Sequence, residues 1–97
     1  MAEAQRREAV AWVAGYAFDR EGAGIMITLD LGGRAVPPGL EGRLKVVGGD
    51  FLRHGHFKIR HVKEGVCEAW MDLAPGLGAE IVELHNQGRL VAVITGG

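Results

Sequence analysis

Residues 65–78 read Gly65-Val66-Cys67-Glu68-Ala69-Trp70-Met71-Asp72-Leu73-Ala74-Pro75-Gly76-Leu77-Gly78, and this stretch decides the predicted fold. Every second residue from Cys67 to Leu73 is apolar, which is the period of a β-strand with one buried face. The Pro-Gly pair then breaks the strand, and a second apolar segment follows at residues 79–84. Strand, breaker and strand in close succession are typical of an antiparallel β-sheet domain.

The rest of the chain repeats this pattern. The 16 glycines among 97 residues lie mostly between apolar segments and indicate many tight connections. We predict strands at residues 10–18, 24–31, 40–46, 57–61 (with a start as early as Phe51), 66–73, 79–84 and 89–95. Residues 1–9 contain good helix formers and predict a helical or frayed lead-in. Seven short strands predict one all-β domain, an immunoglobulin-like β-sandwich, with an open barrel as the alternative.

The charge and cysteine content exclude several classes of protein. Eleven Lys and Arg residues against twelve Asp and Glu residues give a formal net charge of −1, so we expect no binding to nucleic acid. The single cysteine, Cys67, excludes an internal disulfide and a cysteine-based zinc site. A charged N-terminus and short apolar runs match neither a signal peptide nor a membrane span. We therefore expect a cytosolic protein, or the soluble part of a longer, anchored chain.

Three histidines are the candidate metal ligands. His54 and His56 are two residues apart, so both imidazoles would project from the same side of an extended strand. His61 has odd spacing from both and would need a bulge to join them. Because neutral imidazole binds copper and zinc, these residues predict a weak copper site. The alternative is three exposed polar residues, since cationic neighbours such as Arg53 and Lys58 disfavour a metal ion.

Sulfur and hydroxyl chemistry have little support. Met26 and Met71 could bind copper(I), but methionine on a half-apolar strand most often fills the core. Cys67 lies in the same row as Met71 and is predicted to be a small buried residue rather than a reactive thiol. The chain has no serine, which excludes a Ser-His-Asp triad, and its acidic residues show no acid–base pair. The sequence predicts a protein that is not an enzyme.

Two features predict contacts with other proteins. Trp70 falls on the strand face opposite Cys67, where a tryptophan either anchors a partner or covers part of a second sheet. The last predicted strand is apolar on both faces from Leu90 to Ile94. At a sheet edge, such a strand would pair with another chain, so a homodimer formed by edge-strand addition is expected.

The order of these elements resembles the extracytoplasmic domain of the FixH family over residues 4–95. The matching segments are Ala4-Gln5-Arg6-Arg7-Glu8-Ala9 before a strand with Trp12, then Asp30-Leu31-Gly32-Gly33, and then the loop Pro37-Pro38-Gly39-Leu40-Glu41-Gly42. The best match is Gly65-Val66-Cys67-Glu68-Ala69, which is similar to the family's Gly-Val-Tyr-x-Ala strand, followed by Leu73-Ala74-Pro75-Gly76 as its apolar-Pro-Gly turn. The chain departs from the family where Cys67 replaces tyrosine, and where no tryptophan follows the Pro-Gly turn.

The resemblance implies a location and a function. It implies an immunoglobulin-like domain on the periplasmic face of a bacterial inner membrane, with its membrane anchor missing from this chain. It further implies a non-enzymatic accessory factor whose partners are membrane proteins: a copper-transporting P-type ATPase and the assembly machinery of a high-affinity haem–copper cytochrome oxidase. Two alternatives remain open: a small copper-handling protein that uses the segment from His54 to His61, and an immunoglobulin-like interaction module of unrelated origin.

Overall fold

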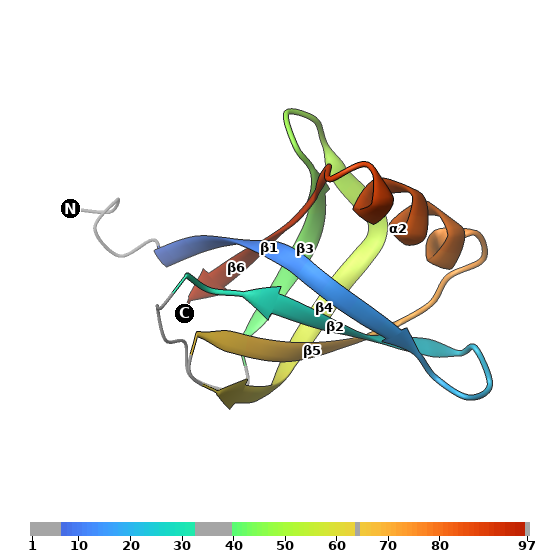
Figure 1. Cartoon of the computed structure of the whole chain (residues 1–97), viewed down its shortest axis with the longest axis horizontal. Coiled ribbons are helices and arrows are strands. Elements are labelled where there is room, and N and C mark those ends of the chain that lie inside the picture. The colour runs from blue at the N-terminus through green and yellow to red at the C-terminus, as the bar shows by residue number, and fades with distance from the viewer. Residues whose placement is uncertain (1–6, 33–39, 64, 97) are drawn as a thin grey trace.

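A computed structural model of the chain describes residues 7–32, 40–63 and 65–96, which form a closed β-barrel of six antiparallel strands with a helix at one end (Figure 1). In chain order, the elements are β1 (Arg7–Phe18), β2 (Gly24–Asp30), β3 (Glu41–Val46), β4 (Phe51–Lys63), β5 (Val66–Asp72), α2 (Leu77–Asn86) and β6 (Leu90–Gly96). Around the barrel the strands follow the order β1-β2-β5-β4-β3-β6, and β6 pairs with β1 to close the ring.

The predicted immunoglobulin-like β-sandwich is wrong. A sandwich has two separate sheets, whereas here every strand is hydrogen-bonded to a neighbour on both sides. The ladder that closes the ring pairs residues 7–12 of β1 with residues 91–96 of β6. Alternation along a strand shows which residues share a face, but it does not show which strands are neighbours. The same local pattern therefore fits a sandwich and a barrel.

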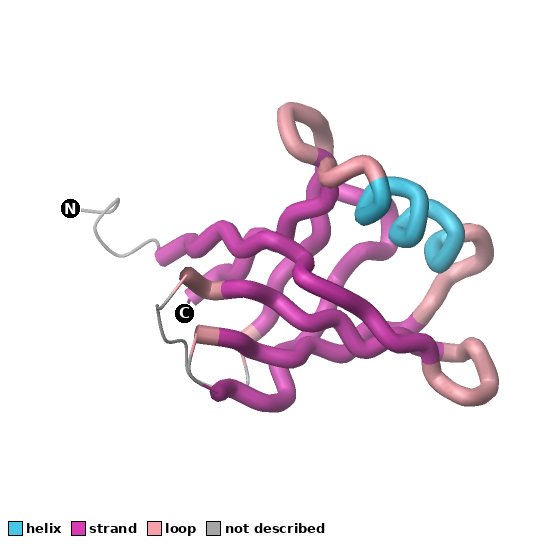
Figure 2. Tube along the Cα trace, viewed as in Figure 1, coloured by secondary structure: helices cyan, strands magenta, loops and turns pink. Residues whose placement is uncertain are grey.

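The predicted strand at residues 79–84 is also wrong, because these residues belong to α2 (Figure 2). The β-branched pair Ile81 and Val82 favoured the strand prediction. In the structure, Leu77 and Ile81 stand four residues apart on one face of the helix and are 3% and 0% exposed. Burial of this face against the barrel outweighs the local strand propensity, as tertiary packing commonly does.

The prediction of a helical or frayed lead-in over residues 1–9 is wrong for residues 7–9, because these already belong to β1. Residues 1–6 and 33–39, which include parts of the segments that resemble the FixH family, lie outside the described residues. The other six predicted strands are confirmed, with β4 longer than expected, since it runs from Phe51 to Lys63.

The barrel interior is a single apolar core. Its wall contributes one inward residue in two from each strand, and no polar or charged side chain of the described residues is buried. Leu77 and Ile81 of α2 join the same cluster and close one end of the barrel. The inward residues that are at most 3% exposed include Ala11, Ile25, Ile27, Leu29, Leu44, Leu52, Phe57, Ile59, Cys67, Ala69, Met71, Leu90, Ala92 and Ile94.

Small residues make this interior possible. A Cβ placed on Gly42 would lie 2.5 Å from the ring of Phe57 and 2.5 Å from the carbonyl oxygen of Val93, so the phenylalanine ring fills the space of the missing side chain. Alanine occupies inward positions on β1, β5 and β6. On β1 this choice places Ala11 and Val13 inside, and it leaves the larger Trp12 on the outer face.

Candidate functional site

The backbone of β4 is irregular at His54, one of the predicted metal ligands. His54 has a φ of 63°, in the left-handed region that residues with a Cβ seldom adopt. The register with β3 shifts here, because Arg43 pairs with His56 while Lys45 pairs with Phe51. The expectation that His54 and His56 project from one side assumed a regular strand, and the strand is not regular at this point.

His56 and His61 face carboxylates on different strands. Nε2 of His56 lies 2.6 Å from Oε1 of Glu41 on β3, and His61 is the register partner of Glu68 on β5. The two histidines are five positions apart in the strand, or about 17 Å of extended chain. Among the described residues, no group of three His, Cys, Asp or Glu side chains could hold a metal ion. Copper binding by these histidines stays a prediction without geometric support.

The sulfur atoms of β5 point into the barrel. Cys67 is 1% exposed and Met71 is 2% exposed, which confirms that Cys67 is buried and that Met71 fills the core. Burial raises the pKa of the Cys67 thiol, so the sulfur stays protonated and weakly nucleophilic at neutral pH. Met26, by contrast, is half-buried and lies on the outer side of β2, opposite Trp70.

Trp70 lies on the outer face of β5 and is half-buried. Its ring packs over Gly24 of β2, since a Cβ placed on this glycine would come within 2.2 Å of the ring. One side of the indole therefore covers the barrel wall. The partner-binding function expected of Trp70 stays a prediction, and this packing favours its alternative as structural cover.

Among the residues whose side chains the structure describes, the most exposed large apolar ones lie on β1. Trp12 is 56% exposed and Val10 is 55% exposed. Their register partners on β6 are Val91, which is only 7% exposed, and Val93, which is half-buried. These four residues, Val10, Trp12, Val91 and Val93, are called the Trp12 patch below. Contiguous apolar side chains on an outer barrel face are typical of surfaces that contact other molecules.

Charged residues of opposite sign border the Trp12 patch. Asp30 of β2 is the register partner of Trp12 on one side. On the other side, Lys45 and Arg43 of β3 are the register partners of the two valines of β6. An apolar centre with a charged rim is the usual anatomy of a protein–protein interface.

Positive charge is concentrated on β3 and β4. Residues 41–63 contain six of the eleven Lys and Arg residues but only two of the twelve Asp and Glu residues. This segment therefore carries a formal charge of +4 and the remainder of the chain −5, which agrees with the overall −1. The asymmetry is visible in the sequence, although the overall charge conceals it. Because β3 and β4 pair with each other, the exposed cations Arg43, Arg53, Lys58 and Arg60 lie on neighbouring strands.

A shallow groove of about 320 Å³ crosses this basic face between β4 and β5. The side chains that line it include His56, Lys58, Arg60, Trp70 and Asp72. Within the described part of the chain, the only basic and acidic side chains within ion-pair distance of each other are His56 and Glu41. Lys58 and Arg60 are exposed and thus face solvent without a carboxylate partner among these residues. These five residues are called the basic groove below.

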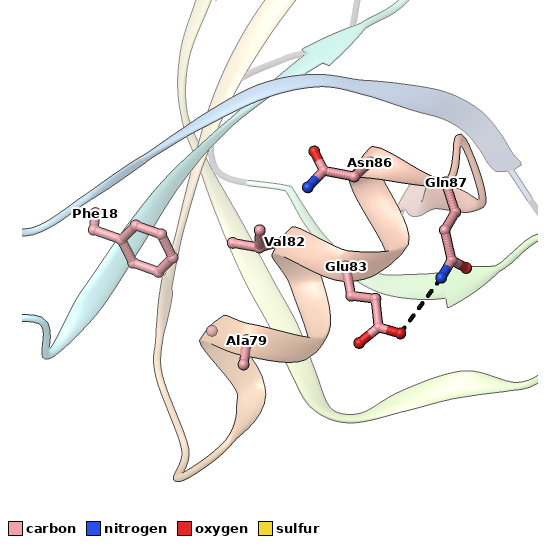
Figure 3. Close-up of a pocket in the computed structure, with 7 residues that line it drawn as sticks. Phe18, Ala79, Val82, Glu83, Asn86 and Gln87 are labelled. Carbon is pink, nitrogen blue, oxygen red and sulfur yellow. Dashed lines mark hydrogen bonds between the residues drawn. The ribbon is translucent and has the colours of Figure 1, made fainter.

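A second depression, of about 600 Å³, lies between the end of β1 and α2 (Figure 3). Phe18 of β1 and Val82 of α2 point toward one another across it, and Phe18 is 44% exposed. At its rim, Nε2 of Gln87 donates a 3.4 Å hydrogen bond to Oε1 of Glu83. No cluster of charged side chains converges here among the lining residues, so this depression offers apolar contact and little chemical selectivity.

No family model, no curated protein and no solved structure matches this chain. The FixH-family resemblance therefore stays a prediction, and the sandwich that it implied is not the fold of the chain. In the described ranges, α2 is the only helix, and its ten residues are too few to cross a bilayer.

Proposed function

We propose that this chain is a non-catalytic interaction domain that binds another protein through the Trp12 patch. The observation that carries the proposal is Trp12 itself, which is more than half exposed on β1 together with Val10, on the same outer face. Tryptophan is enriched among the residues that dominate binding energy in protein interfaces, because it buries a large area with little loss of side-chain freedom. The backbone at Trp12 is paired with Asp30 of β2 on one side and with Val91 of β6 on the other.

The closed barrel determines how such a partner can bind. β6 is hydrogen-bonded to β1 on one side and to β3 on the other, so residues 90–94 offer no open edge to a second chain. The homodimer expected from edge-strand addition would need another route. Contact through side chains on the outer face is open to a partner, and the Trp12 patch is the apolar part of that face.

The rim charges indicate the chemistry of the partner surface. A complementary surface would have an apolar centre, a basic residue facing Asp30 and acidic residues facing Arg43 and Lys45. Complementary rim charges mainly affect the rate of association and the choice of partner. The apolar centre would supply most of the affinity.

The accessory function implied by the FixH-family resemblance is a narrower form of this proposal. In that form, the partner belongs to the copper-transporting ATPase or oxidase-assembly machinery, and the domain is periplasmic. This narrower form rests on short sequence motifs alone. The copper-handling alternative depends on His54, His56 and His61, which the structure distributes along an irregular strand.

The proposal is tested by comparing Trp12→Ala with Trp70→Ala. A photo-crosslinking amino acid at position 10, introduced in the organism that encodes the chain, would identify the partner, and calorimetry with the purified partner would give Kd. We expect Trp12→Ala to weaken binding by about 2 kcal/mol or more, with the thermal midpoint nearly unchanged because the side chain is exposed. Trp70→Ala should change Kd by no more than a few-fold relative to the wild type.

Two results would contradict this proposal. Loss of binding in Trp70→Ala but not in Trp12→Ala would identify the other tryptophan as the anchor. A concentration-dependent dimer in sedimentation equilibrium that Trp12→Ala abolishes would identify the occupant of the patch as a second copy of the chain.

A further inference from the structure

We propose that the basic groove binds an extended, acidic segment of a partner protein. This inference rests on the proposed function in one respect, namely that the domain has a protein partner, but it concerns a different surface. It names the chemistry of the partner: a stretch of chain with carboxylates at alternate positions. The groove lies on the face of the barrel formed by β4 and β5.

Unpaired cations are the first reason. Lys58 and Arg60 line the groove, are exposed and have no carboxylate within ion-pair distance among the described residues. His56, also in the groove, already contacts Glu41, and Asp72 is the single carboxylate in the lining. The groove therefore carries net positive charge, which favours an anionic occupant.

The spacing of the cations is the second reason. Lys58 and Arg60 are alternate residues of β4 and both are exposed, so their side chains emerge about 7 Å apart along the strand. The register with β5 then shifts between Ile59 and His61, which leaves Arg60 unpaired and exposed at the end of the row. Alternate residues of an extended peptide have the same spacing, so successive carboxylates would meet successive cations.

The aromatic rings favour a peptide over single-stranded nucleic acid. Proteins that bind single strands stack bases on open aromatic faces. Trp70 in the groove packs over Gly24, and the ring of Phe51 is covered by Arg43, whose Cζ lies 4.4 Å from the ring centroid. A continuous phosphate backbone would also meet Asp72, whereas a peptide can place an uncharged residue there.

The groove is connected to the Trp12 patch by a row of register partners. Across the barrel wall, Val10 pairs with Val93, Val93 pairs with Arg43, and Arg43 pairs with His56. Neighbouring strands are about 4.8 Å apart, so this row spans about 14 Å from the patch to the groove. A partner segment that leaves the patch could reach the groove within about five extended residues by passing over Arg43.

The experiment measures the fluorescence anisotropy of a labelled peptide of alternating glutamate and threonine, with a glutamine–threonine peptide as the uncharged control. We expect the acidic peptide to bind at low salt, to dissociate as salt is raised, and to bind at least about tenfold more weakly to Lys58→Glu/Arg60→Glu. The control variant Arg20→Glu/Arg89→Glu makes the same charge change at exposed positions away from the groove. Its Kd for the acidic peptide should stay within about threefold of the wild-type value. Lys58→Gln/Arg60→Gln should give an intermediate loss.

Three outcomes would overturn the inference: no binding of the acidic peptide to the wild type, an equal loss in both charge-reversed variants, or tighter binding of oligo-deoxythymidine through Lys58 and Arg60. Peptide binding to Trp12→Ala separates this inference from the proposed function. If Trp12 does not anchor a partner, the acidic peptide still binds this variant with unchanged Kd. If the groove does not bind acidic peptides, Trp12-dependent binding of the natural partner is still measurable.

Discussion

The β2–β5 ladder and the β3–β4 ladder belong to the same barrel but differ in regularity. The first contains seven consecutive register pairs, from Gly24–Asp72 to Asp30–Val66, without interruption. In the second, the register shifts between Arg43 and Lys45, and His54 stands in the left-handed region. Both ladders cover the same apolar core.

The difference shows how the barrel divides structural and binding surfaces. Along the regular ladder, inward residues such as Ile27 and Ala69 are fully buried, and the outer face carries Trp70 as cover. Along the irregular ladder, outward cations gather beside a groove. Bulges turn side chains outward and interrupt pairing, and they are frequent next to binding sites for that reason. The irregular ladder thus supplies the cations of the groove, and the regular ladder supplies Trp70 and Asp72 to its other side.

The largest expected effect compares two core truncations, Ile27→Ala on the regular ladder and Leu52→Ala in the irregular stretch of β4. The two side chains are 0% and 3% exposed. Truncations of this kind cost about 2–5 kcal/mol, and the cost is larger where neighbours cannot move into the cavity. We expect the loss in free energy of unfolding, measured by denaturant unfolding, to fall in the upper half of this range for Ile27→Ala and in the lower half for Leu52→Ala. Equal costs would mean that the two ladders are equally rigid.

A smaller effect is expected at Cys67, in the core behind the regular ladder. Cys67→Ser places a hydroxyl group without a partner in an apolar interior and should cost about 1–3 kcal/mol. Cys67→Ala is the matched control and should cost about 1 kcal/mol, the value of one buried methylene-sized group. If the serine variant is as stable as the alanine variant, the site is polar or hydrated.

The stability of the wild type should also depend on pH through Cys67. Its pKa is raised in the folded protein, so above pH 9.0, the ordinary pKa of a thiol, the unfolded chain loses a proton that the folded chain keeps. The contribution of this thiol to the free energy of unfolding is fully present below pH 9.0. It is lost as the pH rises through the pKa of the thiol in the folded protein. The free energy of unfolding of the wild type should therefore approach that of Cys67→Ala in this range, and a constant difference would contradict the raised pKa.

The smallest effect is expected at His54 on the irregular ladder. Glycine adopts the left-handed region without steric cost, so His54→Gly should keep or raise the free energy of unfolding, by up to about 1 kcal/mol. His54→Val should lower it by about 1 kcal/mol, because a β-branched residue is strained at a φ of 63°. Equal stability of the two variants in thermal unfolding would show that β4 is regular at this position in solution.

Local pattern predicted much of the fold and less of the site. The alternation around Cys67 and Met71 correctly placed both in the core, because a strand with one buried face must repeat every two residues. The segment around Ile81 has strand propensity but lies in a helix, since packing of Leu77 and Ile81 against the barrel decides its conformation. The sequence does not indicate Trp12 as a binding residue, because both faces of β1 are apolar. Periodicity alone does not show which of the two faces points outward.

The sequence by itself determined six of the strands, the turns between them and most of the residues that fill the core. These features depend on neighbours a few positions away, through side-chain alternation and the conformational freedom of glycine. Only the tertiary structure decided that the sheet closes, because residues 7–12 pair with residues 91–96 at the other end of the chain. That closure places Trp12 of β1 beside Val91 of β6, because contacts between distant segments depend on which strands become neighbours. The cations of β3 and β4 already lie together, because these two strands are consecutive and pair with each other.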